Sequence, residues 1–332
     1  MAVKKIKVAI AGLGFMGVTH LRVYQELRNA QVVAVCDSSR EPINGVIGGV
    51  NGNIGDSSAV HVGQGVRYYR NFEDLVADSE IDVVDICTPT FLHPSQIASA
   101  MRAHKHVLCE KPLAQSTHEA RKIMALSERN GNFLMPAMCM RFWPGWSWLK
   151  RVVEGRTYGL VLAARFRRVS AMPAWSGQGT YTAGQSHGGA LFDLHIHDSD
   201  FVNFLFGRPA AVSSAGVTDV AGNVNHVFTH YDYPGGPAVH AEGSWLLTEG
   251  FNMAYTLHCQ QATIDFDLAR GADARAAPAP HRAGAPFRVR YLFGVSLHPP
   301  SRRRKIARVR RGRAAPATPP TWCRRSPRHA ES

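Results

Sequence analysis

Short apolar runs alternate with helical patterns over the first 136 residues. The runs are rich in β-branched residues, which is typical of strands covered on both faces of a sheet. They occupy residues 6–11, 31–36, 82–87, 106–109 and 132–136, and helical patterns occupy 16–28, 72–77, 94–103 and 117–130. We expect Thr117 to cap the last of these helices and Gly131 to end it. Repeated strand–helix units predict right-handed crossovers and a parallel, doubly wound α/β sheet of the Rossmann type.

The pattern changes after Pro144. Helices are predicted at 146–153 and 190–206, and strands at 160–170, 211–218, 225–233, 238–247, 253–258 and 262–268. Strands that follow one another with few helices between them predict an α+β domain with a large, mostly antiparallel open sheet. We therefore divide the chain into a dinucleotide-binding Rossmann domain (1–137), an α+β substrate and oligomerisation domain (138–270) and a tail (271–332).

Charge is distributed very unevenly along the 332 residues. The net charge is +13, and residues 271–332 carry all of it, with 15 Lys plus Arg against 2 Asp plus Glu. Residues 1–270 hold 23 groups of each sign, so a basic field is not part of their function. The tail is dominated by Arg, Ala and Pro and is interpreted either as the product of a shifted reading frame or as disordered chain.

No stretch approaches the roughly 20 apolar residues that span a bilayer, and no membrane partner is predicted. The apolar run after Lys7 imitates a secretory signal, but glycines interrupt it and it fits a strand and turn better. Six cysteines lie far apart without metal-ligand spacing. We interpret them as buried, reduced thiols and expect a cytoplasmic protein.

Residues 12–17 read Gly-Leu-Gly-Phe-Met-Gly between the first strand and the first helix. There the first glycine permits a tight turn, the second lets the backbone approach a pyrophosphate, and the third lets helix pack on strand. Asp37, at the end of the second strand, favours NAD over NADP, although Arg40 could bind a 2′-phosphate. The alternative is a glycine-rich turn without a ligand. The cofactor contacts predicted here are Gly12, Gly14, Phe15, Met16, Gly17, Asp37 and Arg40.

A second cofactor segment follows the third strand. Thr88 and Pro89 form a small, rigid turn in the crevice beyond the strand ends, where it could pass under the nicotinamide. His93 precedes Pro94 and is either a further cofactor contact or an ordinary residue at a helix start.

Two more motifs carry a resemblance to one family. Glu110-Lys111-Pro112 follows the fourth strand, and residues 188–198 read GGALFDLHIHD at the start of the long second-domain helix. Together with the glycine loop, the Thr88-Pro89 turn with His93, and Arg141-Phe142 with Pro144, they make the chain resemble the Gfo/Idh/MocA family of NAD(P)-dependent oxidoreductases. The resemblance runs in register from about residue 5 to residue 268. It implies an enzyme that acts on the CH–OH groups of sugars, inositols and related polyols.

The resemblance assigns the catalytic group to Lys111, Asp193 and His197, and we count Glu110 and Lys111 among the cofactor contacts. Oxidation of a secondary alcohol needs a base for the hydroxyl proton, and His197 can supply it. Lys111 can stabilise the developing alkoxide, and Asp193, four residues before His197, can share its helix face and orient both. The resemblance also makes a cis Lys111–Pro112 bond plausible.

Each of these catalytic assignments has a purely structural alternative. Lys111 could be a solvated strand-end lysine, and His197 an ordinary helix histidine. A zinc site of His187, His195 and His197 with Asp193 is disfavoured because His195 and His197 point to different helix faces, so no metal is predicted.

On the substrate side we place Arg141, Trp175 and His197, with Trp175 in the variable loop where its ring could cover a sugar face. Trp143, Trp146 and Trp148 are interpreted as interdomain packing.

Three functions remain open. The first is a dehydrogenase using NAD, with NADP as the alternative, that forms a homo-oligomer through the C-terminal sheet. The second is a catalytically silent dinucleotide-binding regulatory or scaffold protein. The third takes residues 301–313 as a nucleic-acid arm, but no specific nucleic-acid motif accompanies it, so only non-specific, salt-sensitive affinity is predicted.

Overall fold

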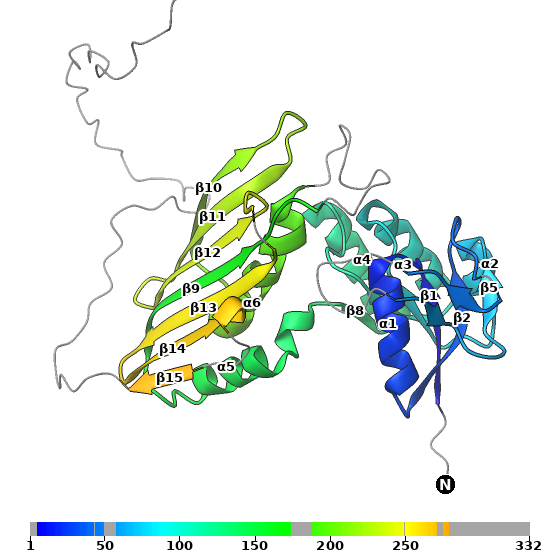
Figure 1. Cartoon of the computed structure of the whole chain (residues 1–332), viewed down its shortest axis with the longest axis horizontal. Coiled ribbons are helices and arrows are strands. Elements are labelled where there is room, and N and C mark those ends of the chain that lie inside the picture. Colours follow the sequence, from blue (N-terminus) through cyan, green and yellow to red (C-terminus); the bar gives the residue numbers. More distant parts are fainter. Residues whose placement is uncertain are drawn as a thin grey trace, which may run out of the picture. The chain divides into compact units, whose positions relative to one another are not determined.

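Figure 1 shows the computed structural model of the chain, which describes residues 5–42, 44–49, 58–173, 188–248, 250–270 and 275–278. These residues form two main sheets, and the fold class predicted from the sequence is confirmed for both. They all belong to one compact unit, Met1–Leu297. The predicted tail lies outside the described residues, apart from a short strand at Arg275–Pro278.

The first sheet is parallel throughout, with strands in the order β5-β2-β1-β6-β7-β8. The strands are β1 (Ile6–Ala11), β2 (Ala30–Cys36), β5 (Arg67–Tyr69), β6 (Val83–Ile86), β7 (His106–Cys109) and β8 (Leu134–Pro136). The helices are α1 (Phe15–Glu26), α2 (Phe72–Ala77), α3 (His93–Arg102) and α4 (Thr117–Asn130). A small antiparallel pair, β3 (Val46–Ile47) and β4 (Val60–His61), lies in the connection before β5. Strand order runs outward both ways from β1 and β6, so their junction is the point at which open α/β sheets bind ligands.

Strand register brings the functional segments of this sheet together. The last residues of β1, β2, β6 and β7 are paired neighbours. The residues that follow these strands therefore lie along one edge of the sheet, and they are Gly12, Asp37, Cys87 and Glu110. Three of these four begin or form the motifs singled out in the sequence.

The ends of α4 show how local chemistry sets helix boundaries. Its N-cap is Ser116, whose hydroxyl accepts the backbone N–H of Glu119 at 3.2 Å and donates to the Glu119 carboxylate at 3.0 Å. The Ser116 side chain thus caps the helix by satisfying a backbone N–H of its first turn. The predicted cap, Thr117, is therefore wrong by one residue, whereas Gly131 ends the helix with a φ of 69°, as expected.

The second sheet has seven strands in the order β10-β11-β12-β9-β13-β14-β15. They are β9 (Val161–Val169), β10 (Ala211–Thr218), β11 (Val224–Asp232), β12 (Ala238–Ser244), β13 (Asn252–Cys259), β14 (Ala262–Asp267) and β15 (Arg275–Pro278). All neighbours are antiparallel except β9 and β12, which run parallel. Strand β15 shows that the sheet continues into the segment assigned to the tail.

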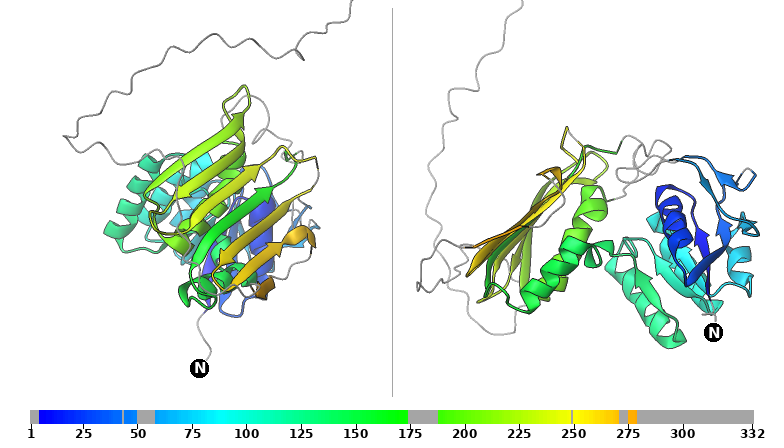
Figure 2. Two further views of the ribbon diagram at one scale, coloured as in Figure 1. Left: turned by 90° about the vertical axis from the view of Figure 1, so that its left-hand side faces the viewer. Right: turned by 60° about the horizontal axis from the view of Figure 1, so that its bottom comes forward.

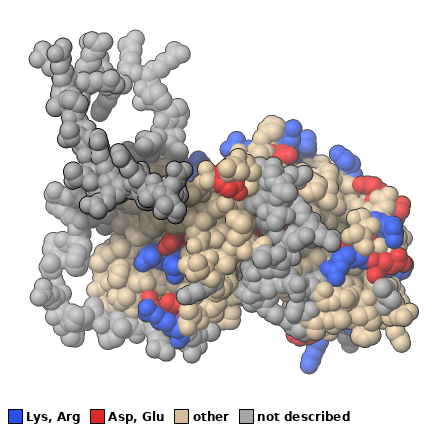
Figure 3. All heavy atoms as spheres, turned by 45° about the horizontal axis from the view of Figure 1, so that its top comes forward, with Lys and Arg blue, Asp and Glu red and all other residues tan. Residues whose placement is uncertain are grey.

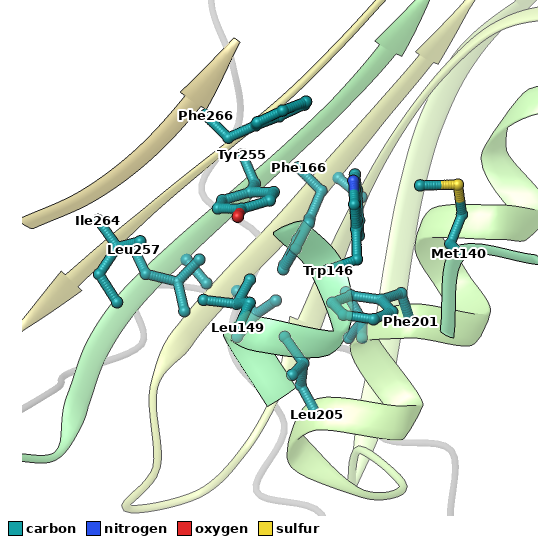
Figure 4. Packing of buried hydrophobic residues seen from close by; sticks show 14 of the residues in the cluster. Met140, Trp146, Leu149, Phe166, Phe201, Leu205, Tyr255, Leu257, Ile264 and Phe266 are labelled. Carbon is teal, nitrogen blue, oxygen red and sulfur yellow. The ribbon is translucent and has the colours of Figure 1, made fainter. Parts of the chain in front are cut away.

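Two helices cover one face of this sheet, as the views in Figure 2 show. They are α5 (Pro144–Glu154) and α6 (Ile196–Phe206). Between them and the strands lies the core drawn in Figure 4, with Trp146 at its centre. The Trp146 ring is 1% exposed and meets Phe201 and Tyr255 edge-on, at centroid distances of 4.7 and 5.1 Å. The prediction that the tryptophans make interdomain packing is therefore wrong for Trp146, which fills the core of its own domain.

The long second-domain helix begins irregularly. Residues Leu191–His195 form a π-helical turn, and regular α6 follows directly. Gly243 on β12 lets this turn approach the sheet, because a Cβ there would lie 2.7 Å from the Cβ of His195. The α-helix predicted from residue 190 is thus confirmed only from Ile196, and π-turns of this kind concentrate at functional sites.

Two further sequence expectations can be compared with the described residues. The five described cysteines are all free thiols: Cys36 and Cys109 are buried as predicted, whereas Cys87 and Cys259 are half-buried and Cys139 is exposed. None of the described helices combines the length and apolar character needed to cross a membrane. On the face shown in Figure 3, described Lys and Arg side chains lie among Asp and Glu side chains, in keeping with the zero net charge of residues 1–270.

The core predicts which tryptophan matters for stability. Replacing Trp146 by Ala should lower the free energy of unfolding by about 3 to 5 kcal/mol, because the cavity cannot collapse among rings fixed on four elements, α6, β9, β13 and β14. Trp148→Ala, on the same helix but only partly buried, should cost clearly less. Urea unfolding followed by far-UV circular dichroism measures both, and equal losses would show that the core is not centred on Trp146.

Candidate active site

The glycine loop after β1 is shaped by two close backbone approaches. Gly12 has a φ of 93°, and a Cβ there would lie 2.6 Å from the carbonyl oxygen of Cys87. A Cβ on Gly17 would overlap the carbonyl oxygen of Gly12. Gly14 differs, because a Cβ there would meet nothing within 4 Å. The outer two glycines thus pack the loop, while Gly14 faces open space beside the start of α1, where a pyrophosphate could approach backbone N–H groups.

Asp37 ties the end of β2 to this loop. Its Oδ2 accepts the backbone N–H of Leu13 at 2.8 Å, and its Oδ1 accepts from Ser39 and from the backbone N–H of Arg40. Only one of these bonds occupies Oδ2, so that oxygen keeps capacity for a ribose hydroxyl. The Arg40 guanidinium donates to the carbonyl of Gly48 at 3.0 Å. The residues at this edge therefore fit a dinucleotide, and Phe15 and Met16 form the first turn of α1 beside them.

His93 has a structural position that the sequence did not show. It is 1% exposed, and its ring nitrogens lie 2.8 Å from the carbonyl oxygens of Thr88 and Pro112. The predicted cofactor contact is therefore replaced by an internal one, in which His93 holds the Thr88-Pro89 turn against the Lys111–Pro112 peptide. That peptide bond is cis, as the resemblance suggested. Thr88 itself donates its hydroxyl to Gln96 at 2.6 Å.

Lys111 and Asp193 meet although 82 residues separate them. The ammonium group of Lys111 donates to Asp193 Oδ1 at 2.8 Å and to the Asp193 backbone oxygen at 2.9 Å. Lys111 follows β7 and Asp193 lies in the π-turn, so the two motifs from different domains form one site. The side chains are 15% and 22% exposed, which leaves the ion pair accessible from one side.

The electrostatics of His197 suit a proton acceptor. Burial, and then the Lys111 and Arg168 cations, hold the pKa of His197 well below its usual 6.5. The ring is therefore neutral near pH 7 and has a lone pair available. Its Nδ1 is buried and has no hydrogen-bond partner among the described residues, a state that a bound ligand could relieve.

His195 is part of the packing, one of the two roles considered from the sequence. Its Nε2 lies 2.8 Å from the Thr229 hydroxyl on β11, and the residue is 1% exposed. Burial, together with the Arg168 cation, lowers the pKa of His195 to about 4. His195 thus anchors the π-turn to the sheet, and His187 lies outside the described residues.

Arg168 is a functional neighbour that sequence reasoning missed. It is 3% exposed, pairs with the fully buried Asp198 through two hydrogen bonds of 3.1 and 3.3 Å, and lies over the Trp146 ring. After burial and the Lys111 cation, the charge of Arg168 is the third cause that lowers the pKa of His197. In the sequence, the only sign of this buried ion pair is Asp198, which directly follows His197 on a helix face expected to be buried.

The remaining predicted site residues are placed as follows. Arg141 forms a two-pronged ion pair with Asp200 and lies over the Phe204 ring, on the surface of α6. Its contact with substrate stays a prediction. Glu110 is 8% exposed and accepts the backbone N–H of Lys111 at 3.0 Å. Trp175 lies outside the described residues.

The fold and site define a two-domain dinucleotide-binding protein with a Lys, Asp and His cluster beside the cofactor edge. Residues 6–138 match the model of the GFO_IDH_MocA family, described as "Oxidoreductase family, NAD-binding Rossmann fold", and residues 146–265 match that family's C-terminal domain. The chain belongs to the Gfo/Idh/MocA oxidoreductase family. This confirms the resemblance, and its first domain is an NAD-binding Rossmann domain.

Several curated proteins are similar to the chain. D-apiose dehydrogenase of Paraburkholderia graminis is 30% identical over 223 residues, which cover 66% of this chain and 56% of that protein. Trans-1,2-dihydrobenzene-1,2-diol dehydrogenase of Mus musculus is 31% identical over 197 residues, covering 58% and 56%. The chain thus spans a little over half the length of these relatives. A solved levoglucosan dehydrogenase in complex with NADH has a TM-score of 0.70 at 20% identity, covering 84% of this chain and 78% of that one, and shows the shared fold.

The open space at Gly14 gives a test of cofactor binding that is separate from folding. Gly14→Ala should leave the free energy of unfolding unchanged but raise the Kd for NADH about 10- to 100-fold, because the added methyl group occupies the space through which the pyrophosphate would approach the backbone. Gly250→Ala is the matched control, since its Cβ also meets nothing within 4 Å. NADH fluorescence titration measures both. Wild-type affinity in Gly14→Ala would mean that the loop does not cradle the cofactor.

The low pKa of His195 predicts acid sensitivity. Its pKa is about 4 in the folded chain and near 6.5 when unfolded, so below pH 6.5 the unfolded state binds the extra proton. Its contribution to stability is therefore full above pH 6.5 and is lost between pH 6.5 and 4, at up to about 1.4 kcal/mol per pH unit. His195→Gln should show a shallower decline in urea unfolding over this range. An unchanged slope would contradict a neutral, buried His195.

Proposed function

We propose that the protein is an NAD(P)-dependent oxidoreductase that transfers hydride between the nicotinamide cofactor and a secondary alcohol of a sugar, inositol or related polyol. The observation that carries the proposal is the Lys111–Asp193 ion pair next to a neutral His197, at the edge where the dinucleotide loop ends. The names of the relatives, such as D-apiose dehydrogenase and inositol 2-dehydrogenase, support this substrate class.

The residues divide the reaction between them. When bound, the nicotinamide supplies the hydride acceptor in oxidation and the hydride donor in reduction. In oxidation, His197 takes the hydroxyl proton while the hydrogen on the same carbon leaves as hydride, and the C–O bond becomes a carbonyl. The Lys111 ammonium stabilises the negative charge that develops on oxygen, and Asp193 fixes the direction of that ammonium. Reduction runs through the same groups in reverse.

NAD is the proposed cofactor in preference to NADP. A carboxylate at Asp37 repels a 2′-phosphate, and the Arg40 guanidinium is already engaged by the Gly48 carbonyl. We further propose a cytoplasmic location, a homo-oligomer formed through the C-terminal sheet, and Arg141 as a substrate contact.

A silent dinucleotide-binding protein is the second candidate. It would keep the glycine loop but would have no use for a neutral His197 facing a lysine cation. The geometry therefore favours turnover over binding alone.

Turnover separates the two candidates. Cyclitols and aldoses are screened for NAD reduction at 340 nm, and the best substrate is then tested with Lys111→Ala and His197→Asn. Each variant should lose about 10²- to 10⁴-fold in kcat/KM, because each removes a group that acts in the transition state. NADH affinity should stay close to that of the wild type. Unchanged turnover in both variants would overturn the mechanism, and the absence of turnover with intact NADH binding would favour the silent protein.

A further inference from the structure

A buried cluster of charged side chains lies behind Lys111 and has no part in the mechanism above. His20 on α1, Asp85 on β6 and Glu110 after β7 converge there, with the Cys87 thiol beside them. Asp85 is fully buried and Glu110 is 8% exposed. Burying two carboxylates side by side costs several kcal/mol unless a cation compensates them.

His20 is that cation by geometry. Its Nδ1 lies 2.9 Å from Asp85 Oδ2, and its Nε2 lies 3.3 Å from Glu110 Oε1. A neutral imidazole has one N–H and can donate to only one carboxylate, whereas an imidazolium donates to both. Burial lowers the pKa of His20, but hydrogen bonds to Asp85, Cys87 and Glu110 outweigh it and raise the pKa far above 6.5.

The cluster connects directly to the catalytic lysine. Glu110 uses one carboxylate oxygen for His20 and the other for the backbone N–H of Lys111, at 3.0 Å. The side chain of Lys111 then reaches Asp193. A continuous series of ion-pair and hydrogen-bond contacts therefore runs from α1 through Glu110 to the lysine backbone, and the ammonium group of Lys111 lies at its end.

We propose that His20 is a positioning residue: as an imidazolium bridging Asp85 and Glu110, it fixes Glu110 so that Glu110 holds Lys111 in line with Asp193. The inference rests on the proposed function only where turnover is measured.

Nδ1 of His20, a carboxylate oxygen of Asp85 and Sγ of Cys87 also lie within 4.8 Å of one another, a spacing that could surround a metal ion. A proton is favoured, because the short Nδ1 to Oδ2 distance is that of a hydrogen bond.

The protonation state is tested in the wild-type chain. Histidine-selective ¹⁵N labelling and a long-range ¹H–¹⁵N spectrum at pH 8.5 report whether both ring nitrogens carry protons. The His20 resonances, identified by their loss in His20→Gln, should be those of an imidazolium. A neutral ring at this pH, or stoichiometric zinc in the purified protein that His20→Gln abolishes, would overturn the proposal.

Positioning is tested through Lys111 itself, without turnover. Trace acetylation with acetic anhydride, quantified by mass spectrometry, should label Lys111 faster in His20→Gln than in the wild type, because its backbone is no longer held. His118→Gln, an exposed histidine on α4, is the matched control and should label like the wild type. Equal labelling of Lys111 in all three proteins would overturn the positioning role.

Kinetics give the third readout. In His20→Gln, kcat should fall about 10- to 100-fold with little change in NADH affinity, since misplacing a catalytic group by about 1 Å has that effect. A variant that unfolds more easily but keeps its kcat would show a merely structural role.

If His20→Gln fails to fold, Glu110→Gln serves in its place, because it keeps the shape of the side chain but removes the charge. If no polyol is turned over, the proposed function fails, but the ¹H–¹⁵N spectrum and the acetylation of Lys111 still decide the role of His20.

Discussion

The Lys111–Asp193 ion pair is the interaction on which the site depends. Lys111 follows a strand of the parallel sheet, and Asp193 lies in a π-turn packed on the mostly antiparallel sheet, so the site forms only where the two domains bring these residues together. Other residues hold both partners in place: the backbone N–H of Lys111 donates to the Glu110 carboxylate, and Asp193 lies in a turn that His195 attaches to the sheet. The pair is therefore rigid before any ligand arrives.

Much of this arrangement could be predicted from the sequence, because it depends on residue type and short spacing. Short sequence motifs mark the glycine loop, Asp37, the lysine after β7 and the Asp-x-x-x-His pair. His20 with Glu110 and Arg168 with Asp198 do not, because each pairing joins residues 30 to 90 positions apart and nothing local marks it. His93 shows the opposite case: its place in a motif predicted a cofactor contact, but the structure buries it between the carbonyl oxygens of Thr88 and Pro112.

Buried charge is used twice in the molecule, with opposite effects on histidine. Between carboxylates, His20 keeps its proton, whereas His197, beside the lysine and arginine cations, gives its proton up. Solvent exclusion alone would make both neutral, so the sign of the neighbouring charge decides which histidine can act as a base.

The order of strands in the second sheet has a consequence for how the chain folds. Strand β9 lies at the centre, but its neighbours β12 and β13 come about 70 to 90 residues later along the chain. During synthesis both edges of β9 stay unpaired until most of the domain has emerged, whereas β1 can pair with the next strand, β2, early and gains its second neighbour, β6, later. High contact order of this kind slows folding. The second domain, rather than the cofactor domain, should therefore set the pace of maturation and be the part most in need of chaperone protection.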